Sequence, residues 1–100
     1  MHCQIAAQES RLSVDLWGKM YIQDISSLHE KITNYINTGS KCVTLDLSKV
    51  TYMDSSGLSL LVTLHKETIN SHGNLTIKGA TGVVGEIIKR THLNKVLNVH

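Results

Sequence analysis

The sequence predicts one α/β domain, in which a small mixed β-sheet is built from strands that alternate with helices. Its 100 residues leave room for one domain only. A hydrophobic fraction of 41% is enough for a compact core. Segments with an apolar residue at every second position alternate with segments in which apolar residues recur every three or four positions. This order is typical of sheets with parallel strand pairs and helical crossovers.

Two strands are expected at the start of the chain. Residues 11–17 alternate strictly between polar and apolar side chains, which predicts a half-buried strand. Residues 3–8 are a weaker candidate, and residues 9 and 10 would join both strands into a hairpin. We expect Gly18 to close the second strand and to let the chain change direction. The apolar positions of the second strand are Leu12, Val14 and Leu16.

The next segment is expected to form a helix, because its apolar residues share one helical face. Ser27 and Glu30 have the spacing of a capping box near its start, and Asp24 is an alternative N-cap. Gly39 is expected to end this helix. The residues of the apolar face are Ile25, Leu28, Ile32, Tyr35 and Ile36.

The middle of the chain repeats this order. Residues 41–47 alternate and predict a strand, with Val43, Leu45 and Leu47 on one face. A short loop then leads to a second helix from about Ser56 to Asn70. Its apolar stripe is broad, which indicates a helix packed firmly against a sheet. That stripe consists of Leu58, Leu60, Leu61, Val62, Leu64 and His65.

A last strand and helix follow a turn at residues 72–74. The strand is expected at residues 75–78, and Thr81 is expected to cap the helix after it. Lys89 and Arg90 suit the negative end of that helix dipole. Residues 93–99 would add a short strand or a packed extension. The apolar face of the third helix consists of Val83, Val84, Ile87 and Ile88.

Charge and hydropathy exclude several classes of protein. A net charge of +2 is too small for a nucleic-acid-binding surface, so no direct nucleic-acid partner is expected. No apolar run approaches membrane-spanning length and the N-terminus lacks a signal-peptide pattern, so we expect a cytoplasmic protein without membrane insertion. Cys3 and Cys42 fall in predicted strands and are interpreted as reduced residues in or near the core.

Several residues suggest sites that their context does not support. The glycine-rich segment 78–85 resembles a dinucleotide-binding turn, but it lies near the end of the chain and no acidic residue follows Glu86. The six histidines include no pair spaced four apart. We therefore expect neither a cofactor nor a metal. Trp17 and Tyr52 border candidate functional loops, and each could anchor a partner or occupy an ordinary rim position.

The most informative segment is the tetrapeptide Asp54-Ser55-Ser56-Gly57, at the start of an apolar helix. Asp54 or Ser55 can cap this helix, and the free backbone N–H groups there form an anion site. A phosphate on a serine at this position would face the positive end of the helix dipole while adding about −1.5 to −2 charges. Ordinary helix capping explains the same spacing. The surroundings lack the Gly-x-Ser-x-Gly pattern of a nucleophile elbow, which disfavours nucleophilic catalysis by this serine, although a base could still come from elsewhere in the fold.

This segment resembles the STAS domain, a family named for sulphate transporters and anti-sigma factor antagonists. The resemblance covers essentially the whole chain, including the order of elements and residues 91–97, and implies one STAS domain over residues 1–100. It departs from the family at Tyr21, where an Asp is often found. The residues that carry the similarity are Asp46-Leu47-Ser48, Val50 and Met53-Asp54-Ser55-Ser56-Gly57-Leu58.

The resemblance implies an anti-sigma factor antagonist, which is a binding module and not an enzyme. Such antagonists are phosphorylated at the second Ser or Thr of the tetrapeptide by an anti-sigma factor that is also a serine kinase, which maps the acceptor onto Ser56. Phosphorylation breaks the complex with the anti-sigma factor, and a phosphatase restores it. The alternative is a non-phosphorylated scaffold, or an accessory subunit of a membrane lipid transporter. The implied partner-binding residues are Tyr52, Met53, Asp54, Ser55, Gly57 and Leu58.

Overall fold

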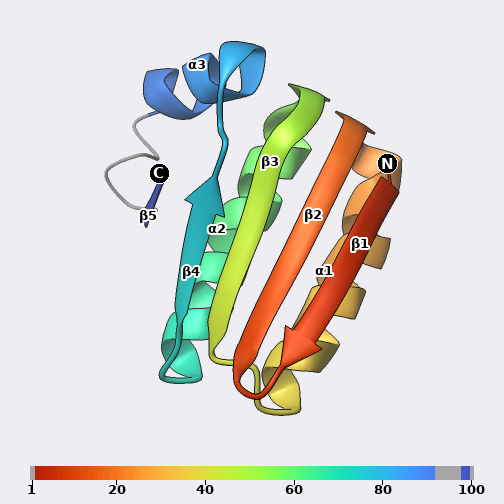
Figure 1. Cartoon of the computed structure of the whole chain (residues 1–100). Coiled ribbons are helices and arrows are strands. Elements are labelled where there is room, and N and C mark those ends of the chain that lie inside the picture. The colour runs from red at the N-terminus through yellow and green to blue at the C-terminus, as the bar shows by residue number, and fades with distance from the viewer. Residues whose placement is uncertain (1, 92–97, 100) are drawn as a thin grey trace.

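The computed structural model describes residues 2–91 and 98–99, which form a two-layer α/β structure. A five-stranded sheet with the order β1-β2-β3-β4-β5 carries α1 and α2 on one face, and α3 lies beyond one end of β4 (Figure 1). β1 and β2 are antiparallel and all other pairs are parallel, which confirms the predicted mixed sheet. The elements are β1 (His2–Gln8), β2 (Arg11–Met20), α1 (Ile22–Asn37), β3 (Cys42–Met53), α2 (Ser55–Asn70), β4 (Asn74–Lys78), α3 (Gly82–Arg90) and β5 (Asn98–Val99).

The predicted hairpin of β1 and β2 is present, with Glu9 in the left-handed region at φ 56. The expected end of β2 at Gly18 is wrong, because the strand continues to Met20. Gly18 instead adopts φ 98 next to a register shift between β2 and β3. A glycine at such an irregularity lets the strand bend without leaving the sheet.

The start of α1 differs from the expected one. The helix begins at Ile22 with Tyr21 as its N-cap residue, so neither Asp24 nor Ser27 occupies that position. The Asp24 carboxylate instead accepts a hydrogen bond from the Tyr21 backbone N–H at 3.1 Å. The physical reason is the longer β2, which leaves Tyr21 as the whole connection to α1. The residues of α1 that are buried are Leu28, Ile32 and Ile36.

The loop expected after residue 47 is wrong as well, because β3 continues to Met53. Val50 and Met53 are buried and keep one face of the longer strand in the core. The alternation breaks at Ser48 and Lys49, which are both exposed, where β3 gains a residue relative to β2. The extra residue in such a bulge shifts the alternation of apolar and polar side chains, so the sequence after residue 47 no longer shows the pattern of a strand. Asp54 is the only residue between β3 and α2.

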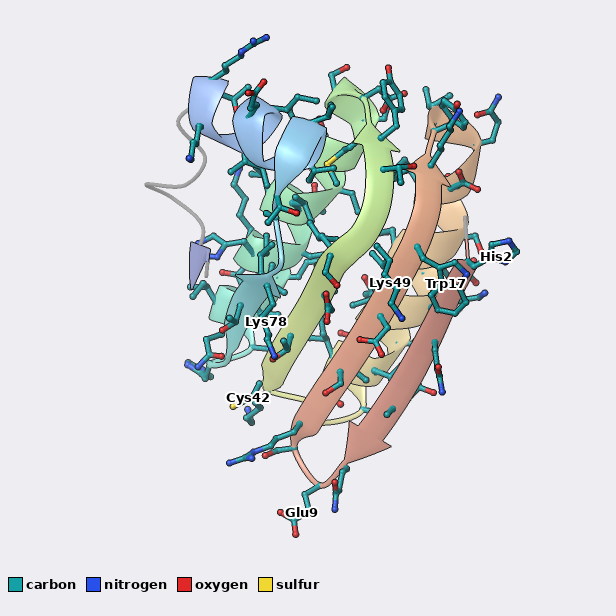
Figure 2. The ribbon with its side chains drawn as sticks, turned by 45° about the horizontal axis from the view of Figure 1, so that its top comes forward. His2, Glu9, Trp17, Cys42, Lys49 and Lys78 are labelled. Atoms are coloured by element: carbon teal, nitrogen blue, oxygen red, sulfur yellow. The ribbon has the colours of Figure 1, made fainter. Side chains whose placement is uncertain are left out.

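The core fills the space between the sheet and the helices α1 and α2, and Val84 and Ile88 of α3 also belong to it. Cys3 is half-buried and packs against it, as expected, whereas Cys42 is exposed, which corrects the interpretation of that residue. Both are free thiols. Cys42 precedes the buried Val43, and so it points to the face of the sheet that α1 and α2 do not cover (Figure 2).

The last elements form where the sequence predicts them, but Val83, expected on the apolar face of α3, is 54% exposed, because the buried side of this helix is centred on Val84, Gly85 and Ile88. Thr81 is the N-cap residue of α3, although its side chain makes no capping hydrogen bond. Lys89 and Arg90 lie in the last turn of this helix. The short strand expected in the tail is β5, which pairs in parallel with β4. The rest of that tail, residues 92–97, lies outside the described residues, and so does most of the similarity at residues 91–97.

Candidate functional site

The tetrapeptide Asp54-Ser55-Ser56-Gly57 lies where the carboxyl end of β3 meets the N-terminus of α2. Asp54 is the N-cap, with extended backbone angles. Its carboxylate accepts hydrogen bonds from the backbone N–H groups of Ser56, at 2.9 Å, and Gly57, at 3.3 Å. Of the two capping residues that the sequence left open, the structure selects Asp54. The cap fixes the direction in which the first turn of α2 presents its serines.

The two serines of the first turn differ in exposure. Ser55 is the first helical residue and is exposed, whereas Ser56 follows it and is half-buried. Both hydroxyl groups lie in the first turn of α2, where helical N–H groups have no intrahelical partner. A negative charge in this turn is stabilised by the helix dipole.

Gly57 allows α2 to approach the ends of β2 and β3. A Cβ atom at this position would collide with Met53 Cγ and would lie 2.8 Å from Met20 Sδ. Met53, Gly57 and Leu58 are all buried, with Leu58 at 9% exposure. Three of the residues that the sequence assigns to partner binding therefore form the floor under the exposed surface of the site.

Two tyrosines lie beside this N-terminus. Tyr21 caps α1 and Tyr52 is the second-last residue of β3. Their rings have centroids 5.6 Å apart and an interplanar angle of 42°. Their exposed fractions are 43% and 40%. Tyr52 therefore presents part of its ring at the surface next to Asp54, where a partner can reach it.

A shallow groove extends from the tetrapeptide along α2. Its volume is about 450 Å³, and its lining includes Ser55 together with the rim of Leu58. Such a groove adds apolar contact area next to the exposed serine. The complete lining consists of Ser55, Leu58, Ser59, Val62, Thr63 and Thr91.

Asp46 and Ser48, which carry part of the similarity noted above, form a local turn at the bulge of β3. The Asp46 carboxylate is hydrogen-bonded by the Ser48 side chain and by its backbone N–H at 2.9 Å, and these bonds lower the pKa of Asp46. Desolvation by burial opposes these bonds and raises the pKa of Asp46, whereas the nearby charges of Lys78 and Lys49 lower it to a lesser extent. This turn holds the irregular part of β3 in place, so its role is structural.

The glycine-rich segment before α3 serves close packing. Gly79 has φ 69, and a Cβ atom there would lie 2.6 Å from Ser48 Cβ. Glycine is required at this position by both the backbone angle and the space. The segment therefore presses against the bulge of β3.

Trp17 does not join the site. Its ring stacks on His2, with centroids 5.8 Å apart and an interplanar angle of 19°, on the face of the sheet that α1 and α2 leave open (Figure 2). His65 is half-buried, and its Nδ1 has no hydrogen-bond partner among the residues that the structure describes. Among residues 2–91 and 98–99, no group of three His, Cys, Asp or Glu side chains is placed to hold a metal ion.

No helix in this part of the chain is long and apolar enough to cross a membrane.

Sequence reasoning missed one polar cluster between α1 and α2. The Glu67 carboxylate lies 2.7 Å from His29 Nε2 and accepts a hydrogen bond from Thr33 Oγ1, also at 2.7 Å. These residues are 34 and 38 positions apart in sequence. No local pattern signals a contact over such a distance.

Comparison with known proteins gives a consistent result. The sequence profile of the STAS domain matches residues 3–100. The chain is 25% identical over 100 residues to the anti-sigma-B factor antagonist of Staphylococcus aureus strain NCTC 8325, covering all of this chain and 93% of that protein. The corresponding protein of Staphylococcus epidermidis is 29% identical over 87 residues, which is 87% of this chain and 81% of the relative.

Solved structures show the same fold. The anti-sigma factor antagonist SpoIIAA in its unphosphorylated form superposes with a TM-score of 0.88 at 17% identity, covering 99% of this chain and 88% of that one. The phosphorylated form of the Bacillus cell fate determinant SpoIIAA gives a TM-score of 0.80 at 16% identity, with coverages of 99% and 91%.

Proposed function

The chain belongs to the STAS domain family, and we propose that it is an anti-sigma factor antagonist whose binding is switched off by phosphorylation of Ser56. One observation carries this proposal: the Asp54-Ser55-Ser56-Gly57 tetrapeptide caps an exposed helix N-terminus beside a surface groove. The similarity to staphylococcal anti-sigma-B factor antagonists over the full chain supports the choice of partner. In this proposal the protein acts by binding and not by catalysis, and it works in the cytoplasm.

The proposed contact surface consists of the exposed groups around the start of α2. Tyr52 offers an aromatic ring, Ser55 a hydroxyl group, and the α2 groove an apolar strip that includes the edge of Leu58. Asp54 fixes the first turn through its two hydrogen bonds. Met53 and Gly57 are buried and contribute indirectly, because their close packing determines how near α2 lies to the strands. Buried aromatic anchors with a polar rim are typical of protein interfaces.

Phosphorylation would act on this surface by charge. A phosphate on Ser56 adds about −1.5 to −2 charges in the first turn of α2. The fold tolerates this charge because it faces the positive end of the helix dipole. The complex does not tolerate it, because a dianion in a desolvated interface is unfavourable unless a partner cation pairs with it. Against a net charge of +2, one phosphate also removes most of the positive excess. A phosphatase would restore binding.

The acceptor can be tested by mass spectrometry. The chain is incubated with ATP and with the kinase-type anti-sigma factor of its own host. We expect an increase of about 80 Da, the mass of one phosphoryl group. Ser56→Ala should abolish this increase, and Ser55→Ala, the matched control in the same turn, should retain it. Full phosphorylation of Ser56→Ala, or loss of the signal only in Ser55→Ala, would assign the acceptor to another residue.

The switch can be tested by binding measurements with the same anti-sigma factor. Ser56→Asp should weaken binding tenfold or more, because it places a carboxylate in the interface. Ser56→Asn has nearly the same size without the charge, and it should bind more tightly than the Asp variant. Equal affinities for the two variants would contradict a charge-based switch. Recovery of a transporter ATPase instead of an anti-sigma factor from the native host would favour the accessory-subunit alternative.

A further inference from the structure

The proposed function does not use the free edge of β1. β1 lies at the border of the sheet and, within the described residues, pairs with β2 alone (Figure 1). Edge strands are usually protected from further pairing by lysines, prolines, bulges or a covering element. β1 has the sequence HCQIAAQ, with no lysine and no proline, and its pairing with β2 is regular. We propose that this edge pairs with β1 of a second copy, which forms an antiparallel dimer with one continuous sheet.

The hairpin determines which backbone groups face the free edge. The two-residue turn at Glu9 and Ser10 makes Gln8 and Arg11 the hydrogen-bonded pair that closes the hairpin. Hydrogen-bonded and non-hydrogen-bonded pairs alternate along an antiparallel ladder. Cys3, Ile5 and Ala7 therefore direct their N–H and C=O groups away from β2, toward the free edge.

A symmetric pairing centred on Ile5 uses every one of these groups. It places Ile5 opposite Ile5 of the second copy, and Cys3 opposite Ala7. Both strands then pair over their full length of seven residues. No Asp, Glu, Lys or Arg lies in the strand, so no pair of these charges meets at the two-fold axis. The register centred on Ile5 is favoured over other registers, because it leaves no outward-facing backbone group of Cys3, Ile5 or Ala7 unpaired.

Apolar side chains line the same edge on the face of the sheet that α1 and α2 cover. Cys3 and Ile5 are half-buried and pack against the core from the helix-covered face. On α1, His29 and Thr33 face Glu67 of α2. At about 100° per residue, Tyr35 lies on the other flank of α1, toward β1. Its exposed fraction is 36%. A second strand beside β1 would cover this apolar strip, which adds hydrophobic burial to the backbone hydrogen bonds.

The dimer is compatible with partner binding. β1 is separated from β3 by β2, so the start of α2 is not part of the paired edge. A two-fold axis perpendicular to the sheet reverses the strand direction, which puts the two α2 N-termini at opposite ends of the dimer. Dimer formation therefore neither requires nor blocks the phosphorylation of Ser56, and each can fail while the other holds.

The oligomeric state is tested by sedimentation velocity on the whole chain. We expect a concentration-dependent species of twice 11.1 kDa. Ala7→Pro should return the chain to a monomer, because it removes an outward N–H without removing a hydrogen bond to β2. Ala7→Ser, which keeps that N–H, is the matched control and should remain dimeric. A Kd weaker than about 1 mM for the unmodified chain would overturn the proposal, and so would a dimeric Ala7→Pro with unchanged circular dichroism.

The register is tested by disulfide formation, with Cys42→Ser in every variant to remove the exposed thiol. Ala7→Cys should give a cross-linked dimer with Cys3 of the second copy under mild oxidation. Within one chain these residues are four strand positions, or about 13 Å, apart and cannot bond. Ala6→Cys, which points to the opposite face of the sheet, should cross-link far more slowly. Equal rates for Ala6→Cys and Ala7→Cys would overturn the register.

Discussion

At the scale of single residues, Asp54 links the fold to the proposed switch. Its carboxylate accepts hydrogen bonds from the backbone N–H groups of Ser56 and Gly57, so a residue two positions before the proposed acceptor holds the acceptor's backbone. The packing of Gly57 against Met53 and Met20 holds the same turn from the other side. The first turn of α2 is therefore preorganised, and a partner or a kinase meets a surface whose backbone is already in place.

We predict that Asp54→Ala lowers the free energy of unfolding by about 1 kcal/mol, the usual effect of losing an N-cap side chain. Asp54→Asn should lose less, because its amide oxygen can accept the same bonds. Urea unfolding followed by circular dichroism measures both. Ser27→Ala, in the exposed middle of α1, is the control and should change stability by less than about 0.5 kcal/mol. A larger effect at Ser27 than at Asp54 would contradict the assigned caps.

At the scale of elements, α1 and α2 are joined by a polar contact above the core. The Glu67 carboxylate on α2 contacts His29 Nε2 and Thr33 Oγ1, which lie on successive turns of α1, each at 2.7 Å. The exposed fractions of the His29 and Glu67 side chains are 39% and 30%, so water screens this contact only in part. A carboxylate that binds two groups one turn apart fixes how the helices slide along each other.

Glu67→Ala should lower the free energy of unfolding by about 1 kcal/mol, which is a hydrogen bond to a charged group discounted for solvent exposure. Thr33→Val removes one of the two partners and should lose less. The coupling between these positions can be measured as a double-mutant cycle in thermal unfolding. Glu30→Ala, at an exposed position on α1, is the control. Additive effects of Glu67→Ala and Thr33→Val would show that the contact does not stabilise the protein.

In the molecule as a whole, one core between the sheet and its helices supports every functional element. β3 runs through the middle of the sheet, between β2 and β4, and ends at Asp54. Its inward residues Val43, Leu45 and Leu47 are each 1% exposed. The open face of the sheet is polar by contrast, with Lys49 and Lys78 projecting from it (Figure 2). The position of the site therefore depends on packing on one face only.

Leu45→Ala should cost about 2–5 kcal/mol, because it leaves a cavity at the centre of the core. That is a large part of the roughly 5–15 kcal/mol that stabilises a domain. Val83→Ala removes an apolar side chain that is 54% exposed, and it should change stability by less than about 0.5 kcal/mol. Denaturant unfolding compares the two variants. Similar losses for both would mean that the core does not lie between the sheet and the helices as described.

Local sequence patterns predict the order of the elements and the inward face of nearly every one. Leu12, Val14 and Leu16 in β2 show why this works: alternation is a local property, and burial follows from it directly. The tetrapeptide was likewise recognisable as a helix start, because an N-cap is made within four residues. These features need no knowledge of distant contacts.

Tertiary structure alone decided the alignment of segments far apart in the chain. The bulge at Ser48 and Lys49 depends on how β3 pairs with β2, so the sequence pattern of the second half of β3 predicts a loop. Gly18 likewise depends on a distant contact: it pairs with Val50 of β3, and β2 therefore continues past it. Which serine is exposed, and which tyrosine lies beside Tyr52, follow from these alignments. The reason is physical: periodicity fixes which way a residue points, whereas register and packing fix what it meets.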